Sequence, residues 1–168
     1  MDHVDMVLAQ WRSERPDLDV SPMGLVGRIN RLAMLVTQGM QETWSEYGLS
    51  LASFDVLATL RRAGSPYALS PGDLIASTMV SSGTMTNRID QLEKAGLVER
   101  APNPDDRRST LIALTPKGFD LIDRTVTAHV ATQARLVGGL SEDQFRELDA
   151  LLRVYLQSFE TKSAPSRS

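Results

Sequence analysis

The sequence predicts a mainly α-helical protein with a small β-hairpin, arranged as a winged helix-turn-helix with further long helices on either side of it. Three observations carry this prediction. Apolar residues recur at helical spacing through most of the 168 residues. A short helix, a break and a second helix occupy about residues 70–95, and two strand-like runs follow at once. Two long helical segments then end the pattern.

Two helices are predicted in the N-terminal part. Residues 4–13 carry apolar side chains on one helical face, at Val4, Val7, Leu8 and Trp11. The run RPDLDVSP then interrupts the pattern. A longer helix is expected to begin at Ser21, whose side chain can cap it, with Pro22 in the first helical position. Its apolar face continues to Tyr47, and Gly48 ends it.

The next segments predict the first part of the helix-turn-helix. A helix is expected over residues 50–64. The turn-rich run SPYALSPG follows, with room for one short strand at residues 67–69. The pair Ser70 and Pro71 has the residue types of a helix start, so a short helix to about Ser77 is expected.

The second helix of the motif, the wing and the C-terminal helices complete the pattern. Residues 81–95 form the second helix, which Gly96 ends as a left-handed cap. The runs LVERA and STLIALT are two strands with a polar loop between them. A long helix is expected over residues 116–137. A last helix starts after Ser141, where Gln144 completes a capping box.

These elements divide the chain into four parts. We expect a helical N-terminal arm, a winged helix-turn-helix lobe able to bind DNA, C-terminal helices and a disordered tail, over residues 1–49, 50–114, 115–160 and 161–168.

Composition limits the classes of function. The chain has no cysteine, which excludes disulfides, thiolate metal sites, thiol nucleophiles and sensing by thiol oxidation. His3 and His129 are too few and too far apart for a metal site. There is no phosphate-binding glycine loop, no nucleophilic serine motif, no secretory signal, and no apolar run near the roughly 18 residues of a membrane span. We therefore expect no enzyme activity, no cofactor, no metal and no membrane association, and a cytoplasmic location.

The charge distribution gives a mixed indication. The net charge of -3 does not by itself favour a nucleic-acid binder. Residues 1–49 hold 4 basic and 7 acidic side chains, whereas residues 81–114 hold 5 of each. Binding to DNA would therefore require these charges to be separated in space. A winged helix that only assembles with other proteins remains an alternative.

Two stretches resemble a known family. The runs SSGTMTNRIDQLEKAGLVER and DDRRSTLIALTPKG combine a recognition helix, a D-x-R wing and an L-T-x-x-G motif. Together they resemble the MarR family of transcriptional regulators, over roughly residues 24–159. The resemblance implies a homodimer whose terminal helices interleave, so that residues 1–49 and 115–160 form a helical dimerisation region and residues 50–114 form the DNA-binding lobe. It also implies a pseudo-palindromic operator in double-stranded DNA, with half-sites about 10 base pairs apart, and release of the DNA by a small ligand.

A narrower resemblance is to the urate-responsive, PecS-type branch of this family. The segment AQWRSERPDLD is similar to the additional N-terminal helix of that branch, and four residues match its ligand site, namely Trp11, Asp55, Arg88 and Arg100. This resemblance implies a small anionic ligand, urate or a related purine. Another aromatic anion or a carboxylate such as a tricarboxylate remains an alternative.

The start of the second helix and the wing carry the residues expected to contact DNA. Hydroxyl and amide side chains contact phosphates and base edges, and they gather at Ser81, Ser82, Thr84, Thr86 and Asn87. The D-x-R pattern assigns Arg108 to the minor groove and Arg107 to the backbone. Loss of one phosphate contact is expected to lower the salt dependence of binding by about one unit of slope. The structural alternatives are that the start of the second helix is only a solvated helix face, and that Arg107 and Arg108 only form a polar loop tip.

The four ligand residues also have structural alternatives. Trp11 on an amphipathic helix is more often a core residue, and Asp55 in a buried helix could form an ion pair. If the four residues meet, the indole stacks on a flat purine, Asp55 accepts a hydrogen bond, and Arg88 and Arg100 bind the anion. Because Arg88 belongs to the recognition helix, an anion that pulls on it would move that helix. Bound DNA would then lower the affinity for the ligand by the same factor by which the ligand lowers the affinity for DNA.

Overall fold

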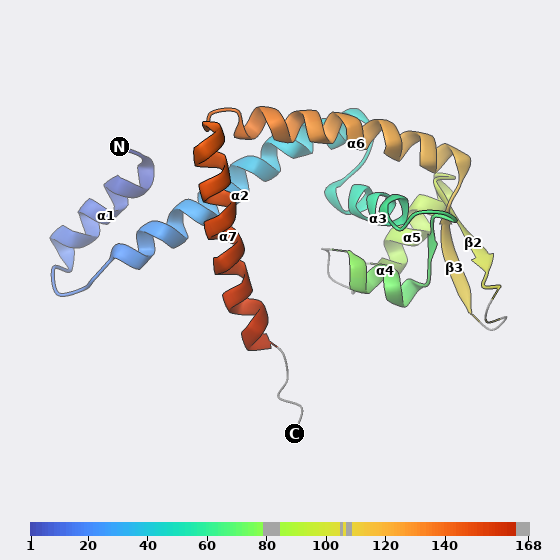
Figure 1. The fold of residues 1–168 in the computed structure, drawn as a ribbon, viewed down its shortest axis with the longest axis horizontal. Coiled ribbons are helices and arrows are strands. Elements are labelled where there is room, and N and C mark those ends of the chain that lie inside the picture. The colour runs from blue at the N-terminus through green and yellow to red at the C-terminus, as the bar shows by residue number, and fades with distance from the viewer. Residues whose placement is uncertain (79–84, 105, 107–108, 164–168) are drawn as a thin grey trace, which may run out of the picture.

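The computed structural model describes residues 1–78, 85–104, 106 and 109–163. It confirms the predicted class, since most elements are helices and a small antiparallel sheet lies at the edge of the lobe (Figure 1). In chain order, the elements are α1 (His3–Glu14), α2 (Ser21–Glu46), α3 (Leu51–Arg62), β1 (Ala68–Leu69), α4 (Pro71–Ser77), α5 (Met85–Lys94), β2 (Val98–Pro102), β3 (Thr110–Leu114), α6 (Pro116–Val137) and α7 (Glu142–Ser163).

A helical arm leads into a separate lobe. α2 and α6 pack against each other, and the lobe at one end of them holds α3, α4, α5 and the sheet (Figure 1). The hydroxyls of Thr43 on α2 and Thr132 on α6 are buried and lie 2.8 Å apart in a hydrogen bond. α7 turns away after α6 and stands apart from the lobe. Among the described residues, no helix is both long and apolar enough to span a bilayer.

Side-chain caps fix most of the helix starts where the sequence predicts them. Ser70 and Thr115, each followed by proline, accept a hydrogen bond from the amide three residues on, at 3.1 and 3.0 Å. The start of α2 differs from the prediction. Ser21 is already helical, Val20 occupies the N-cap position without a side-chain cap, and Asp19 accepts hydrogen bonds from both the amide and the hydroxyl of Ser21, each at 3.0 Å.

The wing has one strand more than the predicted hairpin. The short strand expected at residues 67–69 forms β1 and pairs with β3, which gives the antiparallel order β1-β3-β2. Tyr67, just before β1, has a left-handed backbone with φ of 59°. Its carbonyl accepts a hydrogen bond from the Leu114 amide at 3.1 Å. The wing is therefore anchored to the segment between α3 and α4.

One apolar core joins the lobe to the long helices. Its fully buried side chains come from α3, α4, α5, the sheet and α6, and include Leu57, Leu60, Leu74, Ile112 and Ile122. A second, smaller cluster attaches α1 to the first half of α2 through Val4, Leu8 and Val20. Arg28 on α2 also pairs with Asp2 at 2.8 Å and with Asp5. α1 is therefore held far from the lobe.

The end of α5 is bonded directly to the start of α6. Gly96 ends α5 with the predicted left-handed cap, at φ of 69°. Its carbonyl accepts a hydrogen bond from the Thr115 hydroxyl at 2.7 Å, and Lys117 Nζ donates to the Ala95 carbonyl at 2.8 Å. Gly118 is buried beside the same turn. Only glycine fits there, because a Cβ built on it would lie 1.9 Å from the Leu97 carbonyl oxygen. We call these contacts the α5–α6 junction.

Candidate functional site

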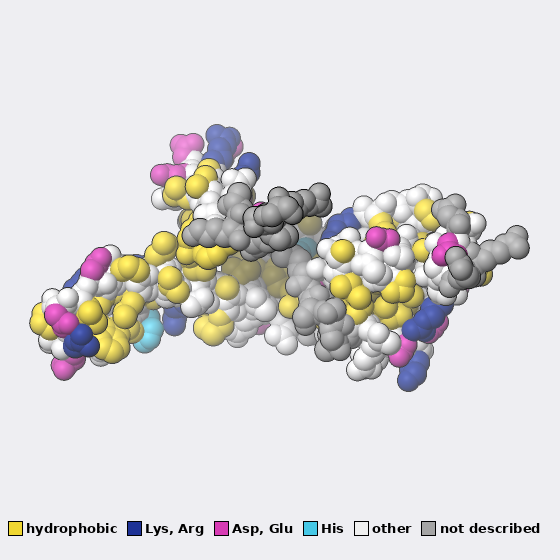
Figure 2. Space-filling view, turned by 90° about the horizontal axis from the view of Figure 1, so that it is seen from below, with side chains coloured by type: hydrophobic (Ala, Val, Ile, Leu, Met, Phe, Trp, Pro, Cys, Tyr) yellow, Lys and Arg dark blue, Asp and Glu magenta, His cyan; other side chains and the backbone are white. Residues whose placement is uncertain are grey.

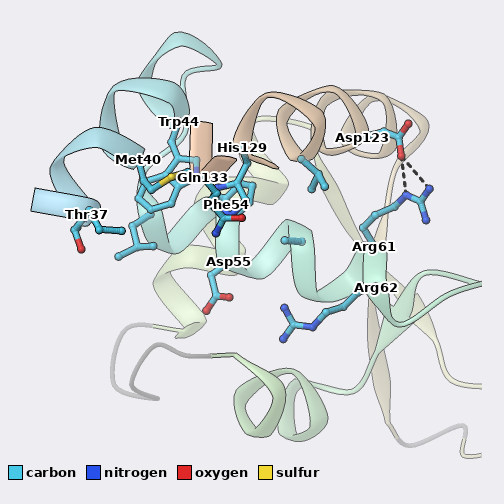
Figure 3. A pocket seen from close by; sticks show the side chains of 14 residues that line it. Thr37, Met40, Trp44, Phe54, Asp55, Arg61, Arg62, Asp123, His129 and Gln133 are labelled. Carbon is cyan, nitrogen blue, oxygen red and sulfur yellow. Dashed lines mark hydrogen bonds and ion pairs between the residues drawn. The ribbon is translucent and has the colours of Figure 1, made fainter. Parts of the chain in front are cut away.

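A cavity of about 770 Å³ lies between α2, α3 and α6. This volume is within the range of about 300–1,000 Å³ that is usual for small-molecule sites. Most of its lining is apolar, and Figure 3 shows side chains from the three helices around it. Its titratable lining residues are Asp55, Arg61, Arg62, Asp123 and His129. We call this space the main cavity.

An aromatic wall closes one side of the main cavity. Trp44 from α2 stacks on Phe54 from α3 and on His129 from α6, with ring centroids 5.4 and 5.9 Å apart. The Trp44 indole donates a hydrogen bond to His129 Nδ1 at 3.2 Å, so His129 is neutral and carries its proton on Nε2. Burial lowers the pKa of His129 below its ordinary value. This wall was not predicted from the sequence.

The lowered pKa of His129 predicts that the stability of the folded protein depends on pH. The ordinary pKa of histidine is 6.5, so below about pH 6.5 the unfolded chain binds a proton that the folded chain does not. We expect the free energy of unfolding to fall as the pH drops from about 7.5 to about 5.5, by at most about 1.4 kcal/mol per pH unit. Thermal unfolding across this range measures it. In His129→Gln, whose amide oxygen can accept from Trp44 without titrating, the slope should flatten; equal slopes contradict the assignment.

Charged groups occupy the opposite side of the main cavity. Asp55 on α3 is only 8% exposed, and Figure 3 shows its carboxylate pointing away from the aromatic wall. Arg61 pairs with Asp123 on α6, with Nη2 at 2.9 Å and Nε at 3.1 Å from the same carboxylate oxygen. Arg62 donates to the carbonyl of Ser77 at the end of α4. The cavity therefore offers one buried acceptor and two cations.

Arg88 lines a second cavity that adjoins the first. This cavity of about 570 Å³ lies where α2 ends and α3 begins, and it shares Thr37, Trp44 and Leu51 with the main cavity. Arg88 is half-buried there, whereas its neighbours Thr86 and Asn87 on α5 are exposed. Of these three neighbouring residues of α5, Arg88 therefore faces the cavity and Thr86 and Asn87 face outward.

Within one chain, the structure does not bring the other two expected ligand residues to this site. Trp11 is 43% exposed on α1, which packs against α2 near Arg28. Trp44 lies roughly 24 Å farther along α2, at about 1.5 Å per residue. Arg100 lines neither of the two cavities. Its guanidinium pairs instead with Asp90, at 2.6 Å, and with Glu93, both on α5.

Five of the residues expected to contact DNA lie outside the described part of the chain, namely Ser81, Ser82, Thr84, Arg107 and Arg108. In the described ranges, no group of three or more histidine, aspartate or glutamate residues could hold a metal ion.

Comparison with known proteins decides the family. A model of the MarR family matches residues 47–109. The HTH-type transcriptional regulator PecS of Dickeya dadantii is 44% identical over 149 residues, which are 89% of this chain and 90% of that protein. The chain belongs to the MarR family. The resemblance stated from the sequence is thereby confirmed.

Solved structures place this MarR-family chain beside regulators that bind DNA. A mutant of Escherichia coli MarR, complexed with operator DNA, has a TM-score of 0.69 and 26% identity, and the match covers 87% of this chain and 97% of that one. BpsR of Bordetella bronchiseptica, whose DNA binding is regulated by 6-hydroxynicotinic acid, has a TM-score of 0.67 and 28% identity over 77% and 90% of the chains. This MarR-family protein is accordingly a DNA-binding transcriptional regulator and not an enzyme.

Proposed function

We propose that this regulator is a homodimeric repressor that binds a pseudo-palindromic operator and is released by a small anion, most readily urate or a related purine. Residues 50–114 would read the DNA, and residues 1–49 and 115–160 would hold the dimer. The observation that carries the proposal is the position of the main cavity, which adjoins a second cavity lined by Arg88 of the recognition helix.

The exposed apolar face of α7 supports the dimer. Every side chain from Glu142 to Glu160 is exposed in the single chain. Large apolar side chains nevertheless repeat at helical spacing on one face, at Phe145, Leu148, Leu152, Tyr155 and Phe159. Figure 2 shows further apolar side chains along the α1–α2 arm, where Leu25 and Leu32 are 57% and 55% exposed. An apolar surface of this extent is typical of an obligate interface.

The outward face of α5 supports contact with DNA. Thr86 and Asn87 are exposed in its first turn, where the side chains of a recognition helix reach base edges and phosphates. We propose Ser81, Ser82 and Thr84 as further contacts of the same helix start, and Arg107 and Arg108 as contacts of the wing.

The chemistry of the main cavity supports a flat anionic ligand. The aromatic wall offers ring faces for stacking, Asp55 offers an acceptor for a ring N–H, and arginines offer positive charge. Trp44 is the stacking ring within one chain, so Trp11 can contribute only from a partner subunit. The identity to PecS favours urate, and the regulation of BpsR by 6-hydroxynicotinic acid makes a small aromatic carboxylate the main rival.

Titration of urate into a complex of the purified protein with operator DNA tests this function. We expect millimolar urate to release the DNA from the wild-type protein. Asp55→Ala should lose the response because the ligand loses its acceptor, and Arg88→Ala because the helix no longer senses the anion. Arg124→Ala, an exposed arginine outside the main cavity, is the matched control. Release that is absent in the wild type, or unchanged in both cavity variants, contradicts the proposal.

A further inference from the structure

Arg61 joins the main cavity to the base of the wing. It lines the cavity from the end of α3, and its guanidinium pairs with Asp123 on α6. The same guanidinium lies over two aromatic rings, 4.6 Å from the Phe119 centroid and 5.3 Å from the Tyr67 centroid. The rings themselves meet edge to face, with centroids 4.9 Å apart. Cations bind such ring faces through the ring quadrupole.

Both rings belong to segments that anchor the wing. Tyr67 immediately precedes β1, and its carbonyl accepts a hydrogen bond from the amide of Leu114 at the end of β3. β1 continues this pairing along the central strand through Ala68 and Ala113. Phe119 lies in the first turn of α6, directly after β3. A displacement of Arg61 therefore removes one contact from the segment before β1 and one from the helix that follows β3.

The ion pair of Arg61 is open to competition. The Asp123 side chain is 56% exposed, so it can turn toward water when it loses its partner. A ligand anion in the main cavity carries the same sign of charge as Asp123 and can compete with it for the Arg61 guanidinium, which lines that cavity. An anion that binds Arg61 would repel Asp123 and draw Arg61 away from the two rings.

We propose that Arg61 is an anion-binding residue of the main cavity and the residue through which a bound anion loosens the wing. This inference rests on the proposed function, and it adds a route to DNA release that is separate from Arg88. Arg88 transmits binding to the recognition helix, whereas Arg61 transmits it to β1 and β3. The two routes would act on the two DNA-contacting parts of one lobe.

Hydrogen exchange of the wing tests the structural link without any ligand. In the full-length protein, Arg61→Met should raise the exchange rate of the amides in β3 by about fivefold, because both ring contacts lose their cation. Arg62→Met is the matched control, since Arg62 lines the same cavity but is bonded to α4. Equal exchange of β3 in the two variants overturns the proposal, whatever urate does.

Urate binding tests the link to the ligand and distinguishes this inference from the proposed function. Asp123→Asn removes the competitor of the anion, so we expect urate to bind the free protein about threefold to tenfold more tightly, a gain that damage to the fold does not produce. Arg61→Met should lower the affinity for urate, and Arg61→Lys should restore part of that affinity. If the wild type does not bind urate, the proposed ligand is wrong while the exchange experiment still decides the role of Arg61. If urate binds but Asp123→Asn leaves its affinity unchanged, Arg61 is not an anion-binding residue.

Discussion

Replacement of Gly118 by alanine is expected to destabilise the protein by about 3 kcal/mol or more. The added Cβ would lie 1.9 Å from the carbonyl oxygen and 2.8 Å from the carbonyl carbon of Leu97, and these are backbone atoms that no rotamer change can move. Relief requires the first turn of α6 to separate from the start of β2. Thermal or denaturant unfolding measures the loss, and a reduced affinity for DNA should accompany it because the α5–α6 junction opens.

Gly72→Ala is the matched control for this substitution. Gly72 also lies in the first turn of a helix that follows a capping hydroxyl residue and a proline, but its added Cβ would meet only the Ser70 hydroxyl, at 3.8 Å. Alanine there should be neutral or slightly stabilising, because it lowers the conformational entropy of the unfolded chain. If the two substitutions cost the same, the close approach at Gly118 does not contribute to stability.

The double substitution of Leu148→Glu with Leu152→Glu is expected to convert the dimer into monomers and to weaken operator binding by about a hundredfold or more. Both leucines are exposed on the apolar face of α7 in the single chain. A buried carboxylate pair at an apolar interface is strongly unfavourable. The loss of DNA affinity follows because two linked half-site contacts gain about 10²–10⁴ in avidity over one. Sedimentation and a binding titration with operator DNA measure the two effects.

The opposite face of the same helix supplies the control. Ala150→Glu with Gln157→Glu adds the same two charges to α7, but at positions that helical periodicity places away from the apolar face. This variant should remain dimeric and bind DNA with nearly unchanged affinity. A monomer in both cases, or a dimer in both, would show that the apolar face of α7 is not the contact between subunits.

Most of the fold could be predicted from the sequence because its signals are local. Proline after a capping residue marks the starts of α4 and α6, and Gly96 marks the end of α5. The pairing of the third strand could not be predicted, because β1 has only two residues and Ala68 pairs with Ala113, 45 positions farther along the chain. Strand pairing over such a distance depends on packing and not on local pattern.

The candidate site was predicted only in part, for the same reason. Asp55 and Arg88 could be chosen from the motif-bearing helices, and the structure places them at adjoining cavities. Trp44 and His129 could not be predicted as site residues, because their contacts depend on the tertiary fold. Trp44 meets Phe54 across the turn at Gly48, and its hydrogen bond to His129 joins residues 85 positions apart.

The α5–α6 junction couples movements of the long helix α6 to the recognition helix α5. Since α5 is bonded to the first turn of α6 through Gly96 and Ala95, the recognition helix must follow any tilt of α6. With 22 residues, α6 is about 33 Å long, so a tilt of about 3° moves its end by about 1.7 Å. In a dimer that is joined at the far ends of these helices, two such shifts add. A rearrangement that leaves the fold unchanged can then alter the distance between the two recognition helices, so that it no longer matches one turn of B-form DNA.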